Sequence, residues 1–215
     1  MTDTSLPRIA IVDDDEALRD SLAWLLDSVG IESRPFADGE AFLAADPAGF
    51  DTVLLDVRMP GLSGLQVQQR LAERENTPPV IFMTGHGDVP MAVAALKAGA
   101  RDFLEKPFNH QQLIDTVQQA LLAHQQARQA RARLSALRER YAALRPKERQ
   151  ILVHVARGLT SREVADHLGI SPKTVEVYRL RAMKALGAAN LAELVRLCVA
   201  LGLVEALPQH PADSD

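Results

Sequence analysis

The sequence contains no uninterrupted apolar run of the roughly 18 residues that a membrane-spanning helix requires. Residues 1–7 also show no basic segment followed by an apolar one, so no secretion signal is predicted. The single cysteine, Cys198, excludes a disulfide-stapled fold, and its apolar helical surroundings predict a reduced core thiol. We therefore expect a soluble, cytoplasmic protein without a membrane partner.

The composition of the chain is typical of globular proteins. Its 215 residues are 47% apolar and 24% charged, a composition that excludes a wholly disordered or collagen-like chain and has room for two modest domains. The net charge of −4 conceals an asymmetry: residues 1–123 hold 9 basic and 19 acidic residues, net −10, and residues 124–215 hold 15 and 9, net +6. The negative charge of the acidic half disfavours binding to a polyanion, whereas the positive charge of the basic half favours binding to the phosphate backbone of DNA. A merely solvated basic surface would explain the charge of the second half equally well.

Short apolar runs alternate with helical patterns in the acidic half. The runs with strand character are Ile9–Val12, Ile31–Phe36, Thr52–Leu55, Val80–Met83 and Asp102–Leu104. Such alternation predicts an α/β domain with a doubly wound, parallel, five-stranded sheet. Ligands of such sheets bind beyond the carboxyl ends of the strands.

Polar residues stand at the carboxyl ends of four of these five runs. They are Asp13, Asp14, Asp56, Thr84 and Lys106. Three carboxylates brought together repel one another unless a cation lies among them, and an all-oxygen ligand set suits Mg²⁺ or Mn²⁺. A hydroxyl and an ammonium group can hold phosphoryl oxygens, and a carboxylate can itself be the nucleophile. The pattern therefore predicts a phosphoryl-acceptor site. For Asp15, Asp38 and Asp88 we prefer the simpler interpretation that they end strands or cap helices.

Four motifs in this half resemble the receiver domain of two-component response regulators. They are Val12–Asp15, Leu55–Gly61, Met83–Asp88 and Phe103–Phe108. The resemblance implies that Asp56 accepts phosphate from a sensor histidine kinase. It also implies that Asp13, Asp14 and the backbone carbonyl of Arg58 join Asp56 around Mg²⁺.

The same resemblance assigns the remaining roles. Thr84 and Lys106 would bind the phosphoryl oxygens, and Phe103 would be the aromatic switch, where many members of the family have tyrosine. The helix expected at Val89–Lys97 would be the output surface. Beyond its own phosphorylation and dephosphorylation, the protein is not expected to be an enzyme.

The chain between the two halves has a helical pattern without glycine or proline from His110 to Pro146. Asn109 and Gln112 resemble a capping box that opens this helix. Apolar residues alternate three and four apart at Ala127, Ala130, Leu134, Leu137, Tyr141 and Leu144. This spacing is typical of a coiled-coil seam, although the alanines weaken it, so a dimer helix and a solvated spacer both remain open.

In the basic half, helical patterns break at Gly158, Gly169 and Gly187, which predicts four short helices. Segments Ser161–Leu168 and Pro172–Leu186 flank a turn that contains glycine, the pattern of a helix-turn-helix. Ser171 would cap the second helix.

Further motifs resemble the LuxR-type helix-turn-helix domain, and the combination with a receiver resembles the FixJ-like branch. They are Leu144–Arg149, Gly158–Ala165, Leu168–Tyr178 and Leu191–Val195. The resemblance implies binding to a double-stranded DNA operator, with base contacts from Glu176, Val177 and Leu180. Exposed apolar side chains suit thymine methyl groups, and a glutamate can accept from cytosine N4. Four basic residues are expected to contact phosphates: Arg162, Lys173, Arg181 and Lys184. Thr174, at the start of the second helix, completes the predicted DNA-binding residues.

These predictions combine into one hypothesis. We expect a receiver at 1–122, a helical linker at 123–143, an all-α DNA-binding domain at 144–207 and a disordered tail at 208–215. Phosphorylation of Asp56 would promote homodimerisation and DNA binding, which acts on the transcription machinery. A metal-dependent phosphatase or phosphotransferase is the main alternative, and against it no Walker-type loop is present. A constitutive DNA-binding protein with a vestigial receiver is the third.

Overall fold

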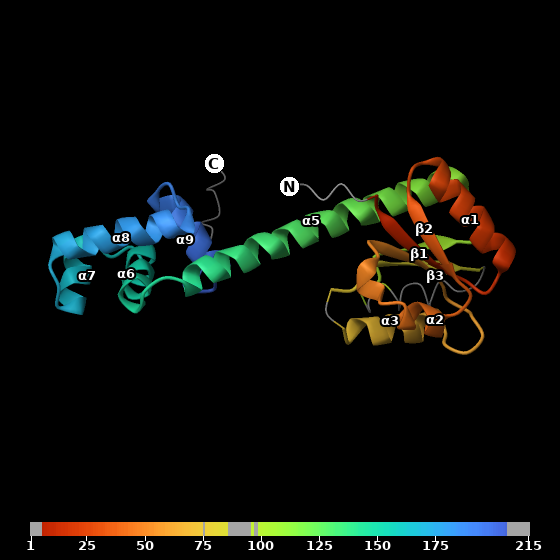
Figure 1. Cartoon of the computed structure of the whole chain (residues 1–215), viewed down its shortest axis with the longest axis horizontal. Helices are drawn as coiled ribbons and strands as arrows, with labels where there is room; N and C mark the ends of the chain where they lie inside the picture. The colour runs from red at the N-terminus through yellow and green to blue at the C-terminus, as the bar shows by residue number, and fades with distance from the viewer. Residues whose placement is uncertain (1–5, 75, 86–95, 97–98, 206–215) are drawn as a thin grey trace, which may run out of the picture. The chain divides into compact units, whose positions relative to one another are not determined.

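The computed structural model describes residues 6–74, 76–85, 96 and 99–205. Internal contacts divide the chain into two compact units, with the boundary between Arg128 and Gln129 (Figure 1). Apart from Leu96, the helix predicted at Val89–Lys97 lies outside the described residues, as do Asp88 and the tail at 208–215. None of the helices in the described ranges is long and apolar enough to span a membrane.

The first unit is the predicted parallel α/β domain. Its strands are β1 (Arg8–Val12), β2 (Glu32–Phe36), β3 (Thr52–Asp56), β4 (Val80–Thr84) and β5 (Asp102–Glu105). All neighbouring pairs are parallel, and the strand order is β2-β1-β3-β4-β5. The helical segments around the sheet are α1 (Glu16–Ser28), α2 (Gly39–Ala44), η1 (Pro47–Gly49), α3 (Gly64–Ala72) and the first part of α5 (His110–Ala142). The predicted fold class is therefore confirmed for this unit.

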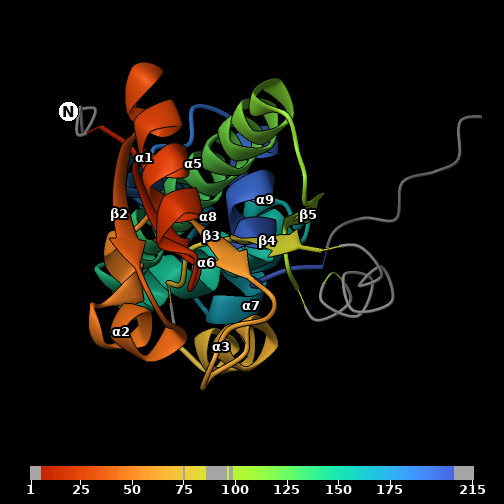
Figure 2. The same cartoon turned by 90° about the vertical axis from the view of Figure 1, so that its right-hand side faces the viewer.

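Successive strand residues point to opposite faces of the sheet, and helices cover both faces. On β1, Ile9 and Ile11 pack with α1 and α5, where Leu26 and Leu113 are fully buried. Ala10 and Val12 face the other way, into the cluster of α2 and α3. Two helical layers thus cover the two faces of one sheet (Figure 2).

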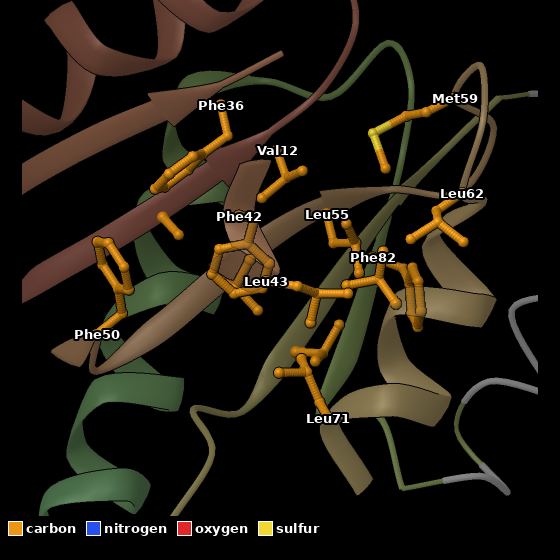
Figure 3. Packing of buried hydrophobic residues seen from close by; sticks show 14 of the residues in the cluster. Val12, Phe36, Phe42, Leu43, Phe50, Leu55, Met59, Leu62, Leu71 and Phe82 are labelled. Carbon is orange, nitrogen blue, oxygen red and sulfur yellow. The ribbon is translucent and has the colours of Figure 1, made fainter. Parts of the chain in front are cut away.

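Aromatic rings fill one end of the cluster beneath α2 and α3 (Figure 3). Phe36, Phe42 and Phe50 lie with ring centroids 5.5 to 6.0 Å apart. Phe82 from β4 is fully buried at the other end of this cluster, towards α3. Rings in edge-to-face contact stabilise a core beyond the area they bury, by about 0.5–1.5 kcal/mol per pair.

Helix α5 opens where the sequence predicted, since the Asn109 side chain accepts from the Gln112 amide at 2.7 Å. It runs as one helix of 33 residues. Its later seam residues are used inside the chain: Leu137 is 8% exposed, and Tyr141 packs against the same cluster of the second unit. This part of the seam therefore forms neither a dimer helix nor a solvated spacer, because its side chains pack within the same chain.

The second unit adds the four predicted helices. They are α6 (Pro146–Ala156), α7 (Ser161–Leu168), α8 (Pro172–Leu186) and α9 (Leu191–Ala200). Thr160 caps α7 and Ser171 caps α8, each through its side-chain oxygen. Gly169 ends α7 at φ 62°, a left-handed conformation that glycine adopts without strain, so the chain turns directly into α8. Cys198 is fully buried in the core, and burial raises the pKa of its thiol to about 11.

The turn between β3 and α3 is closely packed at Gly64. A Cβ at this residue would lie 2.2 Å from the Asp56 carbonyl oxygen and 3.0 Å from the Phe82 ring. Gly49 has open space at the same position, with nothing within 4 Å. The two glycines therefore form a matched pair of test positions.

We predict that Gly64→Ala lowers the free energy of unfolding of the first unit by about 2 kcal/mol, because the backbone of β3 must shift to admit the methyl group. Gly49→Ala should leave it unchanged or raise it by about 0.5 kcal/mol. The measurement is urea unfolding followed by the methyl NMR resonances of Ile9 and Ile11, which are fully buried on β1 and report on this unit alone. Equal stability of the two variants would contradict the close packing.

Candidate functional site

Four strand ends meet at one edge of the sheet and bring predicted site residues together. Asp13 follows β1, Asp56 ends β3, Thr84 ends β4 and Lys106 follows β5. The Lys106 ammonium donates to Asp13 Oδ2 at 2.7 Å and to Asp56 Oδ1 at 2.6 Å. A lysine that is distant in sequence thus bridges two carboxylates from adjacent strands.

The carboxylates of this cluster are withdrawn from water. Asp13 is 1% and Asp56 7% exposed, and Thr84 beside them is 3% exposed. Burial raises the pKa of Asp56, and although the Lys106 hydrogen bond opposes this effect, the charge of Asp13 adds to it. Burial alone would lower the pKa of Lys106, but its two carboxylate partners outweigh burial and raise it. Lys106 is therefore held as a cation.

Backbone and side-chain hydrogen bonds fix the two carboxylates in place. The Arg58 amide donates to Asp56 Oδ2 at 2.7 Å, and the Asp15 amide donates to Asp13 Oδ1 at 3.0 Å. The Arg19 guanidinium donates to the Asp13 carbonyl at 2.7 Å, a contact absent from the sequence prediction. No strand-end signal could have indicated Arg19, because it lies inside α1.

The remaining aspartates behave differently from the bridged pair. Asp15 caps α1 and Asp38 caps α2, which is one of the two structural roles expected of them. Asp14 is exposed, and no third acidic, histidine or cysteine side chain within the described ranges completes a metal cluster. The oxygens of Asp13 and Asp56 nonetheless converge on a cationic group. This acidic, all-oxygen donor set therefore fits Mg²⁺.

Thr84 lies on β4, the strand beside that of Asp56, and Phe103 lies on β5, the next strand along. The Thr84 carbonyl accepts from the Lys106 amide at 2.7 Å, which joins the ends of β4 and β5. Phe103 is half-buried and packs against the cluster beneath α2 and α3. The Lys106–Pro107 peptide bond is cis, and a hollow of about 390 Å³ adjoins it, lined by Leu18, Lys106, Pro107 and Phe108.

Helix α8 carries the second set of predicted residues. Its buried face contains Val175, Ala182 and Leu186. Leu180 is 70% and Val177 45% exposed, although both are large apolar side chains. The other outward residues predicted for DNA are Arg162 on α7 and Lys173, Glu176, Arg181 and Lys184 on α8, all exposed. Thr174 is half-buried, and its hydroxyl lies 2.7 Å from that of Ser171 at the helix cap.

A parallel sheet with a bridged aspartate pair, followed by a helix-turn-helix unit, is the architecture of a signal-responsive DNA-binding protein. Residues 9–118 match the response regulator receiver domain family, and residues 142–198 match the bacterial regulatory proteins of the luxR family. The chain belongs to the response regulators of two-component systems that join a receiver domain to a LuxR-type DNA-binding domain.

Similar proteins share both domains over nearly their whole length. The transcriptional regulatory protein FixJ of Bradyrhizobium diazoefficiens is 43% identical over 94% of this chain and 98% of its own. The C4-dicarboxylate transport transcriptional regulatory protein DctR of Rhodobacter capsulatus is 45% identical over 88% of this chain and 98% of its own.

Solved structures give the same result. The response regulator StyR has a TM-score of 0.79 at 39% identity, with 90% of this chain and 98% of that chain covered. Full-length FixJ from B. japonicum has a TM-score of 0.58 at 42% identity, with 94% and 100% covered. The predicted family, fold class and general function are confirmed.

We predict that Lys106→Met destabilises the first unit by about 3 kcal/mol at neutral pH, because it leaves two buried carboxylates without their cation. Asp56 already has a raised pKa, so its charged form is disfavoured by the fold, and loss of Lys106 raises that pKa further. The deficit should therefore be largest above the folded pKa of Asp56 in the variant and shrink as pH falls through that pKa, because a protonated carboxyl no longer needs the cation.

The methyl resonances of Ile9 and Ile11 in urea at several pH values measure this effect. Arg128→Met is the matched control, since the Arg128–Asp51 pair is a single contact of 3.1 Å with the arginine side chain 61% exposed, and its loss should cost under about 1 kcal/mol. Asp56→Asn added to Lys106→Met should restore stability. A pH-independent deficit that the second substitution leaves unchanged would contradict the electrostatic account.

Proposed function

We propose that Asp56 accepts a phosphoryl group from a sensor histidine kinase and that this modification promotes pairing of receivers and binding to an operator. The observation that carries the proposal is the buried Asp56 carboxylate held 2.6 Å from the Lys106 ammonium. Solvent-shielded placement beside a fixed cation suits a group that must accept a dianion.

In the transfer, an Asp56 carboxylate oxygen attacks the phosphorus of a phosphohistidine. The new O–P bond forms as the P–N bond breaks, and the released imidazole takes up a proton. Lys106 then redirects a donor from Asp56 towards a phosphoryl oxygen, and Thr84 supplies a hydroxyl from the adjacent strand. Asp13 and Asp56, with Asp14 and the Arg58 carbonyl, would hold Mg²⁺, whose positive charge would neutralise that of the transferred group.

The response would pass through the strand ends that contact the site. Lys106 binds both carboxylates, and its amide is bonded to Thr84. Withdrawal of the ammonium towards a phosphoryl group changes the contacts of β4 and β5 together. Phe103, half-buried on β5, is the side chain whose packing would follow that change.

DNA recognition is proposed for the exposed face of α8. The basic side chains of Arg162, Lys173, Arg181 and Lys184 are suited to phosphates, and their contacts carry no sequence information. Glu176, Val177 and Leu180 are suited to base edges in a major groove. Two receivers that pair would place two such helices on adjacent half-sites, which raises their effective concentration without a new contact to DNA. Bound there, the dimer would act on the transcription machinery.

We predict that acetyl phosphate with Mg²⁺ adds one phosphoryl group to the wild type and none to Asp56→Asn. Intact mass spectrometry measures the adduct, and hydroxylamine should remove it because an acyl phosphate is labile. Asp27→Asn, an exposed aspartate of α1, is the control and should be modified like the wild type. Modification of Asp56→Asn to the wild-type extent would exclude Asp56 as acceptor, and multiple turnover of the donor would favour the phosphotransferase alternative.

We predict different effects for two neighbouring residues of α8. Arg181→Ala should weaken binding to all DNA sequences and lower the salt dependence by about one counterion, because it removes a phosphate contact. Leu180→Ala should change the preferred sequence instead, since it removes an apolar base contact.

Selection from a random DNA library, followed by salt titrations of binding, separates the two effects. Arg138→Ala, an exposed arginine of α5, is the control for loss of charge alone. Equal losses on every sequence from both α8 variants would overturn the assignment of the reading face.

A further inference from the structure

Two histidines that the regulatory mechanism does not use meet on neighbouring helices of the second unit. His154 lies in the last turn of α6, and His167 lies in the last turn of α7. Their rings are 5.8 Å apart between centroids, with an angle of 38° between the ring planes. The two residues are 13 positions apart in the sequence, so no ligand spacing indicated the pair.

The hydrogen bonding of His167 determines which nitrogen is free. Its Nδ1 lies 2.7 Å from the Glu163 carbonyl oxygen in the same helix. A carbonyl oxygen only accepts, so Nδ1 carries the hydrogen and Nε2 keeps its lone pair. Histidine ligands of metal ions usually have this arrangement, with one nitrogen donating to a backbone carbonyl and the other facing the ion.

His154 is equally available. It is half-buried, and within the described part of the chain no side-chain hydrogen bond or ion pair engages its ring. The nearby Glu163 carboxylate is occupied elsewhere, because its Oε2 accepts from the Thr160 amide at 2.8 Å and from the Thr160 hydroxyl at 2.7 Å. The two imidazoles are therefore the only ligands that this contact offers among the described residues.

The ring separation suits one shared ion. A zinc–nitrogen bond of about 2.1 Å places the ion about 3.2 Å from each ring centre, so a tetrahedral angle puts the two centres about 5.2 Å apart. The observed 5.8 Å differs by well under 1 Å. Small rotations of the exposed His167 side chain are enough to close that difference.

We propose that His154 and His167 form a two-imidazole site for a divalent transition-metal ion such as Zn²⁺. Water completes the coordination, so the site is open and exchangeable, unlike a closed four-ligand structural site. The bound ion links the end of α6 to the end of α7, the first helix of the helix-turn-helix. Because the folded unit binds the ion and the unfolded chain does not present this pair, the ion stabilises the second unit.

Histidine side-chain ¹H–¹³C spectra of the full chain, recorded during titration with ZnCl₂ at constant Mg²⁺, test the proposal. We expect the resonances of His154 and His167 to shift together with a single midpoint. His154→Phe is the decisive variant because it keeps a ring at this position and removes the ligand nitrogen. In that variant the His167 shift should be lost, whereas His110→Gln should leave both shifts intact.

A second readout comes from tyrosine fluorescence, since both tyrosines, Tyr141 and Tyr178, belong to the second unit. Excess zinc should raise the melting temperature reported by the tyrosines by about 5 °C in the wild type and leave His154→Phe unchanged. A zinc response of His167 that persists in His154→Phe, or shifts with two different midpoints, would overturn the shared site and leave an aromatic contact only.

Discussion

The carboxylate cluster at the end of the sheet depends on one interaction, the ammonium of Lys106 between the buried carboxylates of Asp13 and Asp56. Asp13 and Asp56 come from adjacent strands, and their charges would repel one another without a cation between them. Lys106 reaches them only because the strand order places the ends of β1, β3, β4 and β5 along one edge. The parallel sheet therefore brings the two carboxylates together, and the Lys106 ammonium offsets the repulsion between their charges. A phosphoryl group at Asp56 would compete for that same cation, which links modification to the contacts of β4 and β5.

Helix α5 contributes to both cores of the chain. Leu113 and Val117 complete the layer that α1 forms on the sheet, and Leu137 is buried with α6 to α9 in the second unit. The helix begins four residues after Lys106, so the carboxylate cluster and α5 are close in sequence. Leu137, Tyr141 and Leu144 of its apolar seam pack inside the second unit. The three earlier seam residues, two of which are alanine, would offer only a weak surface for pairing of α5 helices.

Strands, helices and strand-end residues could be predicted from the sequence because each depends on local spacing. Alternation of apolar runs located all five strands, and glycine breaks with Ser171 as cap located α7 and α8 within a residue. Three features could not be predicted. Heptad spacing predicts an apolar seam but does not say which surface packs against it, so the burial of Leu137 in the second unit could not be predicted. The Arg19 bond to Asp13 and the His154–His167 pair depend on the packing of separate elements, which spacing does not encode.

The most direct test of the central claim is the molar mass of the full chain in solution with Mg²⁺, measured by light scattering before and after addition of beryllofluoride, a mimic of the phosphoryl group. The account predicts that the wild type changes from monomer to dimer and that Asp56→Asn remains a monomer, because only the wild type offers the carboxylate that the mimic binds. An unchanged wild-type mass, or an equal change in Asp56→Asn, would contradict the claim that modification of Asp56 drives assembly.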